Sequence, residues 1–289
     1  MSGRRSRTHH YIPKGLQKNF CFEGKRIWYS EKESTGKYSK PEVRNIDSTF
    51  QKKDYYTVRD KGKPSDVVEK NFYSKLDDFL AKLVESVLVS FEDGIIPTFD
   101  SEGEKIVARA LFYCVKRNPD FSSRFDDHQI GLQVTEEMLD AVSEWDGSHE
   151  LIESLNRRKE NRIDLRSIGR DIRVRAQLQS SDKLEAELDT LNVRWAVSEG
   201  SHSFILCSNL VYRIGNGGPN GLSNPDFEMW LPISPKKALV LMRVRSRDVP
   251  LVVKIDRDHM RKINLYGVDE SHCIASHDQK LLQSLISNR

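Results

Sequence analysis

Two adjacent histidines near the start of the chain are the first candidates for chemistry. His9 and His10 lie in the stretch 8–20, THHYIPKGLQKNF. An imidazole titrates near neutral pH, so one histidine can act as a general acid or base. Neighbouring side chains of an extended segment point to opposite faces, so the two rings are not expected to share one metal ion. We predict a catalytic role for His10, stiffened by Pro13, with His9 as the second candidate. The alternative is a structural histidine pair.

Arginines are the second group with chemical potential, because a guanidinium binds phosphate well. The segment 162–175, RIDLRSIGRDIRVR, places several arginines at helical spacing. Arg117, before Asn118-Pro119, could contact an anion or simply cap the end of a helix. The arginines of 162–175 could bind a nucleic-acid backbone or pair with the acidic middle of the chain. The candidate nucleic-acid contacts are Arg117, Arg162, Arg166, Arg170 and Arg173.

Other polar motifs are less specific. Asn209, in the predicted strand 203–214, could fix a substrate or bind the backbone of a neighbouring loop. No GxSxG elbow surrounds Ser208, so a serine hydrolase is not expected. The glycine-rich stretch 215–221 lacks the Gly-Lys-Ser/Thr of a P-loop and reads as a hairpin loop. The four cysteines contain no CxxC pair. We therefore predict no metal site, and no particular cofactor is implied.

Composition and charge limit the class of protein. With 37% hydrophobic and 31% charged residues, the 289-residue chain can build a sizeable core. No apolar run is long enough to cross a membrane, and no secretory signal is visible. We expect a cytoplasmic protein with reduced thiols and no membrane partner. Residues 1–70 carry a net charge of +8, residues 71–160 carry −9 and residues 161–289 carry +4. The basic start could meet nucleic acid or pair with the acidic middle.

These motifs must be positioned by an α+β fold. A β-hairpin is predicted over 19–30, with its turn at Glu23-Gly24-Lys25, and it could join a distant sheet. Residues 31–65 look like a loop-rich, surface-exposed connection. We expect one domain over 1–289, with a helical block over 66–191 and a mainly antiparallel sheet over 192–289. Helices are predicted over 68–87, 102–117, 134–158, 162–191 and 277–287, and strands in 193–199, 202–214, 228–234, 237–244 and 250–255.

Several stretches, in this order, resemble a bacterial family called domain of unknown function 4238. The resemblance implies a single α+β architecture and no known reaction. The family's strand usually carries an Asp where this chain has Ser208 and a Pro where it has Leu210, while Asn209 is kept. The matching stretches are HHYIPKGLQKNF at 9–20, VEKNFYSKLDDFLAKLVE at 68–85, ARALFYCVKRNPDF at 108–121, SFILCSNLVYRI at 203–214, MWLPISPKKALVL at 229–241 and INLYGVDESHCIAS at 263–276.

Two functions of different classes fit these observations. The first is a hydrolase that acts on nucleic acid, a nuclease-like effector in bacterial defence. It rests on the titratable histidine, the arginine face and the basic start of the chain. The second is a non-enzymatic protein that binds nucleic acid or another protein, which Ser208 in place of the family's Asp favours. We expect His9 or His10 to lie near the strand 203–214, because both signatures would then belong to one site.

Overall fold

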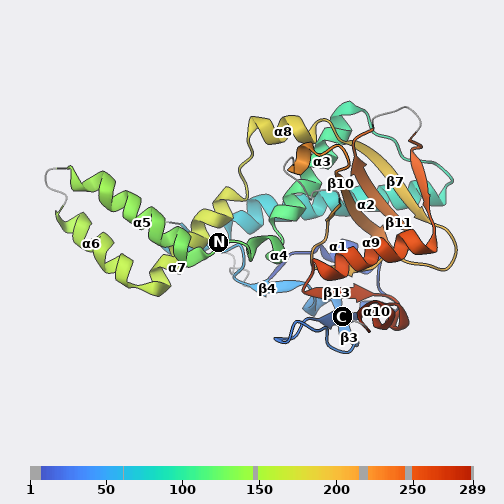
Figure 1. Cartoon of the computed structure of the whole chain (residues 1–289), viewed down its shortest axis with the longest axis horizontal. Helices are drawn as coiled ribbons and strands as arrows, with labels where there is room; N and C mark the ends of the chain where they lie inside the picture. Colours follow the sequence, from blue (N-terminus) through green and yellow to red (C-terminus); the bar gives the residue numbers. More distant parts are fainter. Residues whose placement is uncertain (1–7, 61, 146–148, 215–220, 245–248, 288–289) are drawn as a thin grey trace, which may run out of the picture.

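The computed structural model describes residues 8–60, 62–145, 149–214, 221–244 and 249–287. The chain is α+β, as predicted, with helices concentrated in its middle and sheets built from both ends (Figure 1). Most of the predicted glycine-rich loop lies outside the described residues, as does Asp146-Gly147, where the helical region predicted over 134–158 could break. No helix within the described part of the chain is long and apolar enough to cross a membrane.

Within the described residues, a sheet of five strands forms the larger part of the C-terminal half. Its strand order is β12-β7-β11-β10-β9. Neighbouring strands run antiparallel, except that β12 runs parallel to β7. Trp195 of β7 packs edge-on against Phe91 and donates its indole N–H to the carbonyl of Pro97 at 2.8 Å. The bounds are β7 (Asn192–Ser198), β9 (Tyr212–Ile214), β10 (Glu228–Ser234), β11 (Lys237–Met242) and β12 (Val252–Ile255).

A four-stranded sheet, again counted over the described residues, joins the two ends of the chain. Its order is β3-β2-β13-β8, and all its pairs are antiparallel. The N-terminal strand pair therefore enters a sheet with distant C-terminal strands, as the sequence suggested. The turn of the predicted hairpin forms, with Gly24 at φ +55°, but residues 19–22 are not a strand. The bounds are β2 (Arg26–Glu31), β3 (Glu42–Asn45), β8 (Leu206–Cys207) and β13 (Cys273–Ser276).

The prediction of a loop-rich, exposed connection over 31–65 is partly wrong. Besides β3, it contains β4 (Gln51–Lys53), β5 (Val58–Asp60) and β6 (Lys63–Ser65). The strand β4 pairs with β1 (Thr8–His10), which places Lys53 opposite Thr8. Tyr55, Tyr56 and Phe50 of this segment are buried. Because their partners lie far away in the sequence, no local hydrophobic period marked these aromatic residues as core.

Helices pack on the sheets and around the N-terminal segment. Gly15 of α1 lets that helix approach α2 closely, since a Cβ there would lie 3.2 Å from the Cβ of Ala81. A π-helical turn, η2 (Glu69–Tyr73), precedes α2. The helix α9 was not predicted, although Asp256 caps its first turn. The bounds are α1 (Lys14–Lys18), α2 (Ser74–Glu92), α3 (Ser101–Lys116), α4 (Pro119–Ser122), α8 (Asp182–Leu188), α9 (Arg257–Asp269) and α10 (Gln279–Ile286).

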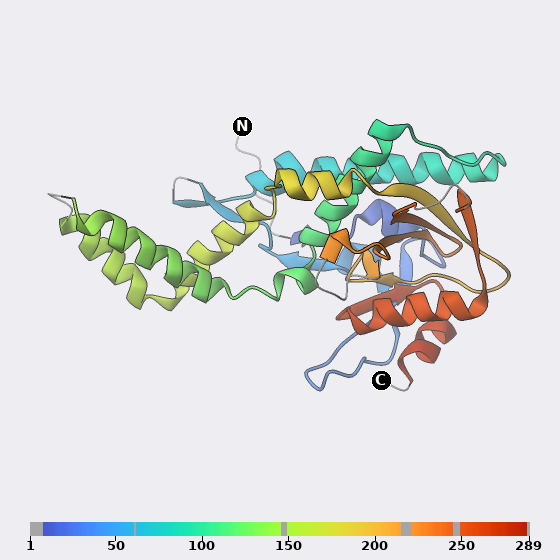
Figure 2. The ribbon, with the colours of Figure 1, turned by 45° about the horizontal axis from the view of Figure 1, so that its top comes forward.

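An arm of three helices projects from the body, as both ribbon views show (Figures 1 and 2). It consists of α5 (Asp127–Ser143), α6 (His149–Glu160) and α7 (Arg162–Ala176). The helices α5 and α7 touch backbone to backbone at two glycines. A Cβ on Gly131 would lie 2.0 Å from the carbonyl oxygen of Leu165, and a Cβ on Gly169 would lie 1.7 Å from that of Asp127. Larger residues would force the helices apart.

Candidate active site

A polar cavity of about 340 Å³ lies where β1 meets the beginning of α2. The strand supplies His10, the first turn of α1 supplies Lys14, the π-helical turn supplies Glu69, and α2 supplies Asp77 and Asp78. These residues come from two segments separated in the sequence, and the α1–α2 contact holds them together. Titratable groups of both signs therefore converge in one hollow.

The alternation of β1 separates its two histidines. His9 is fully buried, and its ring stacks on Tyr56 with 5.5 Å between ring centroids. Its Nδ1 accepts a hydrogen bond of 2.9 Å from the backbone N–H of Tyr56. His10 faces the cavity instead. The geometry gives His9 a structural environment and leaves His10 as the histidine that can reach a ligand.

One ring nitrogen of His10, Nε2, is buried without a hydrogen-bond partner among the described residues. Burial lowers the pKa of His10, and the charge of Lys14 lowers it further, while Asp47 and Asp77 act in the opposite direction. The neutral ring is therefore favoured near pH 7, with an available nitrogen that can accept a proton.

The pKa of Glu69 is shifted in the opposite direction to that of His10. Its Oε2 is also buried without a hydrogen-bond partner among the described residues. Burial raises the pKa of this carboxyl to about 7; Arg117 lowers it, whereas Asp77 and Asp66 raise it further. Glu69 belongs to the π-helical turn, a local geometry that occurs often at functional sites. A protonated Glu69 can donate a proton near neutral pH.

Arg117 contacts two residues of the cavity wall from inside the protein. Its guanidinium is fully buried and forms an ion pair with Asp77. It also donates a hydrogen bond of 2.7 Å to the carbonyl oxygen of His10 and lies over the Tyr73 ring. The side chain predicted to contact an anion thus has its charge partner inside the protein. It fixes β1 against α2.

The residues after Arg117 connect the cavity to the segment 203–214, which forms β8 and β9 in two different sheets instead of the one predicted strand. The side-chain amide of Asn118 donates to the carbonyl of Ser208 and, at 3.2 Å, to the Oδ1 of Asn209. The backbone N–H of Asn209 donates to the Oγ of Ser271 at 3.0 Å. Asn209 is buried and does not line the cavity. It joins chain segments, which is one of the two roles considered for it.

A second polar cluster surrounds Ser208, and no sequence motif indicated it. The Oγ of Ser208 donates to Asp120 at 2.5 Å and accepts backbone N–H groups from His272 and Cys273 at 3.0 and 3.1 Å. The Nδ1 of His272 lies 3.0 Å from that Oγ and contacts Asp120 as well. Burial lowers the pKa of His272, but the hydrogen bonds with Asp120 and Cys273 outweigh it and bring the pKa to about 10.

This Ser-His-Asp arrangement differs from a hydrolytic triad. In a triad, the serine and the aspartate bind opposite nitrogens of the ring, so that the histidine can take the serine proton. Here both contact Nδ1, while Nε2 lies 3.4 Å from the hydroxyl of Tyr11. Ser208 is also fully buried. The cluster therefore links α4, β8 and β13 through hydrogen bonds and the ion pair of His272 with Asp120.

The predicted arginine face divides into exposed and enclosed members. Arg162 and Arg166 are exposed on α7, and Arg166 lines a shallow hollow at the start of α5. Arg170 is half-buried. Arg173 is buried and donates two hydrogen bonds to Asp127, at 2.7 and 3.2 Å. Only the outer part of this face can meet a large ligand.

Side chains that can ligate a metal ion do not cluster in the described part of the chain. Across residues 8–287, apart from the undescribed gaps, no three His, Cys, Asp or Glu side chains are grouped to hold a metal ion. His259 pairs with Asp256 at 3.0 Å, whereas His272 pairs with Asp120, so the two histidines do not share one site.

Comparison with known proteins places the chain in a family. The family model described as "Protein of unknown function (DUF4238)" matches residues 8–280, so the chain belongs to that family. Neither the curated proteins nor the solved structures yielded a match. The matched range includes every residue of the cavity.

Proposed function

We propose that this protein is a hydrolase that cleaves phosphodiester bonds of nucleic acid, with His10 and Glu69 as the proton-exchanging pair. The observation that carries the proposal is that His10 Nε2 and Glu69 Oε2 are both buried without a hydrogen-bond partner among the described residues, and that both residues line one cavity. The pKa of His10 is lowered and that of Glu69 is raised to about 7. Such tuning toward the working pH is typical of catalytic acids and bases.

The directions of the two pKa shifts assign the roles. A neutral His10 accepts a proton, so it acts as the general base. A protonated Glu69 donates one, so it acts as the general acid. The opposite assignment would need a charged His10 together with a charged Glu69. That combination is the less populated one, because burial lowers the pKa of His10 and raises that of Glu69 to about 7.

The reaction follows from these roles. His10 takes the proton of the attacking oxygen, which belongs to a 2′-hydroxyl of RNA or to water, and a new P–O bond forms. The bond from phosphorus to the leaving oxygen breaks, and Glu69 protonates that oxygen. In RNA the 2′-hydroxyl is already held beside the phosphorus, which lowers the entropic cost of attack. RNA is therefore the favoured substrate.

Basic residues beside the cavity support a phosphate substrate. Lys14 lines the cavity and pairs with Asp47 at 2.8 Å. Lys53 is exposed on β4 and lies opposite Thr8, another residue of the cavity wall. Arg117 neutralises Asp77 from inside the protein. A nucleic-acid strand could then follow the lysines and present a phosphodiester to His10.

The test is a cleavage assay on RNA and DNA oligonucleotides of one sequence, with and without a chelator. We expect RNA cleavage that persists in the chelator. His10→Ala and Glu69→Gln should each lower the rate by about 100-fold or more, the usual scale for a general acid or base. His9→Ala should affect stability more than chemistry. His149→Ala, at an exposed position of α6, is the matched control and should retain full activity.

Two outcomes would contradict the proposal. A folded His10→Ala protein with wild-type activity would exclude His10 from the reaction. A wild-type protein that cleaves neither nucleic acid, with or without added divalent metal, would favour the second candidate.

The second candidate is a binding protein without catalysis, and the arm favours it. This arm exposes large apolar side chains in addition to its arginines, and such groups commonly mark a binding surface. Tight binding of nucleic acid or of a protein by the isolated chain, without turnover, would support this candidate. The exposed apolar residues are Met138, Trp145, Leu151 and Ile163.

A further inference from the structure

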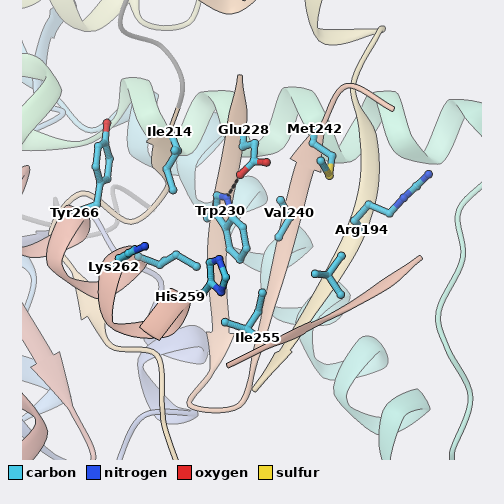
Figure 3. Close-up of a pocket in the computed structure, with 12 residues that line it drawn as sticks. Arg194, Ile214, Glu228, Trp230, Val240, Met242, Ile255, His259, Lys262 and Tyr266 are labelled. Carbon is cyan, nitrogen blue, oxygen red and sulfur yellow. Dashed lines mark hydrogen bonds between the residues drawn. The ribbon is translucent and has the colours of Figure 1, made fainter. Parts of the chain in front are cut away.

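An apolar cavity of about 460 Å³ lies between the five-stranded sheet and α9 (Figure 3). It shares no lining residue with the cavity at His10. Its volume falls in the range of small-molecule sites, roughly 300–1,000 Å³. The walls come from two elements that the fold holds apart, so the hollow is already formed without a ligand.

The floor of this cavity is a row of side chains across the sheet. Trp230 of β10 pairs with Val240 of β11, and Val240 pairs with Arg194 of β7, so the three stand on the same face. The indole N–H of Trp230 donates to the carboxylate of Glu228 at 2.7 Å. Because the indole's polar atom is satisfied there, its ring presents only apolar surface to the cavity.

The opposite wall is one face of α9. His259, Lys262, Ile263 and Tyr266 are spaced three or four residues apart, and all line the cavity. Ile263 is buried, whereas His259 and Lys262 are exposed. Figure 3 shows His259, Lys262 and Tyr266 extending from α9 on one side, with the labelled strand residues on the other. The cavity thus has an apolar interior and a polar mouth.

The side chains that line the cavity carry more positive than negative charge. Among the described residues that line the cavity, Arg194 and Lys262 are cations, and Glu228 is the carboxylate, already engaged by Trp230. The Nε of Arg194 is buried and has no hydrogen-bond partner in the described part of the chain. An anionic group at the mouth would satisfy this unbalanced charge.

We propose that this cavity binds a small amphipathic carboxylate, with an alkyl body over Trp230 and Val240 and its carboxylate at the mouth beside Lys262. A nucleotide fits less well, because the floor offers apolar atoms where a base and a ribose need hydrogen-bond partners. A neutral lipid would leave Lys262 without a counter-charge. This site goes beyond the proposed nucleic-acid hydrolysis and does not depend on it.

The experiment is a calorimetric titration of the full chain with sodium decanoate, sodium octanoate and decanol. We expect one decanoate per chain. Octanoate should bind about tenfold more weakly, because two fewer methylenes leave water. Lys262→Gln should weaken decanoate about fivefold, the upper range for an exposed charge pair, and leave decanol unchanged. Val253→Trp, at a half-buried position of the wall, should fill the space and abolish binding.

Lys280→Gln is the matched control, since Lys280 is exposed on α10 and does not line this cavity. It should bind decanoate as the wild type does. Absence of decanoate binding by the wild type would overturn the proposal. Unchanged binding by a folded Val253→Trp variant would place the ligand elsewhere and also overturn it. Equal affinity for decanol and decanoate would overturn the carboxylate assignment.

Discussion

The guanidinium of Arg117 donates a 2.7 Å hydrogen bond to the backbone carbonyl of His10 while it is ion-paired with Asp77. One buried side chain therefore ties the strand that carries the proposed base to the helix that forms the opposite wall. The orientation of His10 depends on this link, although Arg117 itself does not line the cavity. Arg117 is therefore a positioning residue for His10.

Replacing Arg117 should strongly destabilise the fold. Arg117→Ala leaves the partly buried Asp77 without its partner, and breaking a buried pair costs about 3–5 kcal/mol. The measurement is urea unfolding followed by circular dichroism. Arg117→Ala combined with Asp77→Ala should recover part of the loss, because no unpaired charge remains. A double variant as unstable as the sum of the two single variants would contradict this coupling.

Glu69 should make stability fall as the pH rises. Its pKa in the folded protein is raised to about 7 from an ordinary value of 4.5. The folded state thus binds more protons than the unfolded state between these values, so the free energy of unfolding decreases from about pH 4.5 to pH 7. Glu69→Gln should match the wild type near pH 4.5 and exceed its stability by about 1–2 kcal/mol at pH 8. Glu85→Gln, at an exposed position of α2, is the control.

His272 adds a pH dependence of its own, which is why variants must be compared with the wild type at each pH. The raised pKa of His272, about 10 against an ordinary 6.5, means that its contribution is fully present below pH 6.5 and is lost as the pH rises toward 10. His272→Gln should flatten the stability curve in that range. A curve with the wild-type slope above pH 7 would show that the pair with Asp120 contributes nothing.

The close contact of α5 and α7 should reverse the usual effect of alanine. In a helix, Gly→Ala ordinarily stabilises by up to about 1 kcal/mol. At Gly169 the new Cβ would lie 1.7 Å from the carbonyl oxygen of Asp127, so we expect Gly169→Ala to destabilise the arm by about 2 kcal/mol or more. Hydrogen exchange of the α5 and α7 amides measures this. Gln133→Ala, on an exposed part of α5, should change protection little.

The exposed arginines of α7 should govern binding of nucleic acid, if the arm takes part. Arg162→Ala with Arg166→Ala should weaken binding and flatten its salt dependence, because fewer counterions are released for each lost phosphate contact. Arg166→Ala with Arg170→Ala should have a smaller effect, since Arg170 is half-buried. Fluorescence anisotropy with labelled RNA at several salt concentrations checks both. Identical salt slopes for all three proteins would assign these arginines to solubility or to the fold.

The sequence by itself was sufficient to predict the elements that have a local hydrophobic pattern. The helices α2, α3 and α10 were predicted from the sequence because each carries a regular apolar face, and the strands β7, β10 and β11 because each is a short run of apolar, β-favouring residues. The runs of β10 and β11 are buried on both faces. Alternation along β1 likewise suggested that His9 and His10 would point to different sides. Both histidines, and the α+β class, could be identified before any tertiary contact was known.

The tertiary structure decided which titratable groups are buried and which of them lie together. The raised pKa of Glu69 comes from its burial near β1, and the pair of Asp120 with His272 joins residues far apart in the chain. Strand pairing between β2 and β13 and the burial of Tyr56 are equally non-local. Burial and electrostatic environment depend on distances in space, which sequence spacing does not contain. The sequence could therefore name the titratable groups, while only the fold determined which of them lose water and meet.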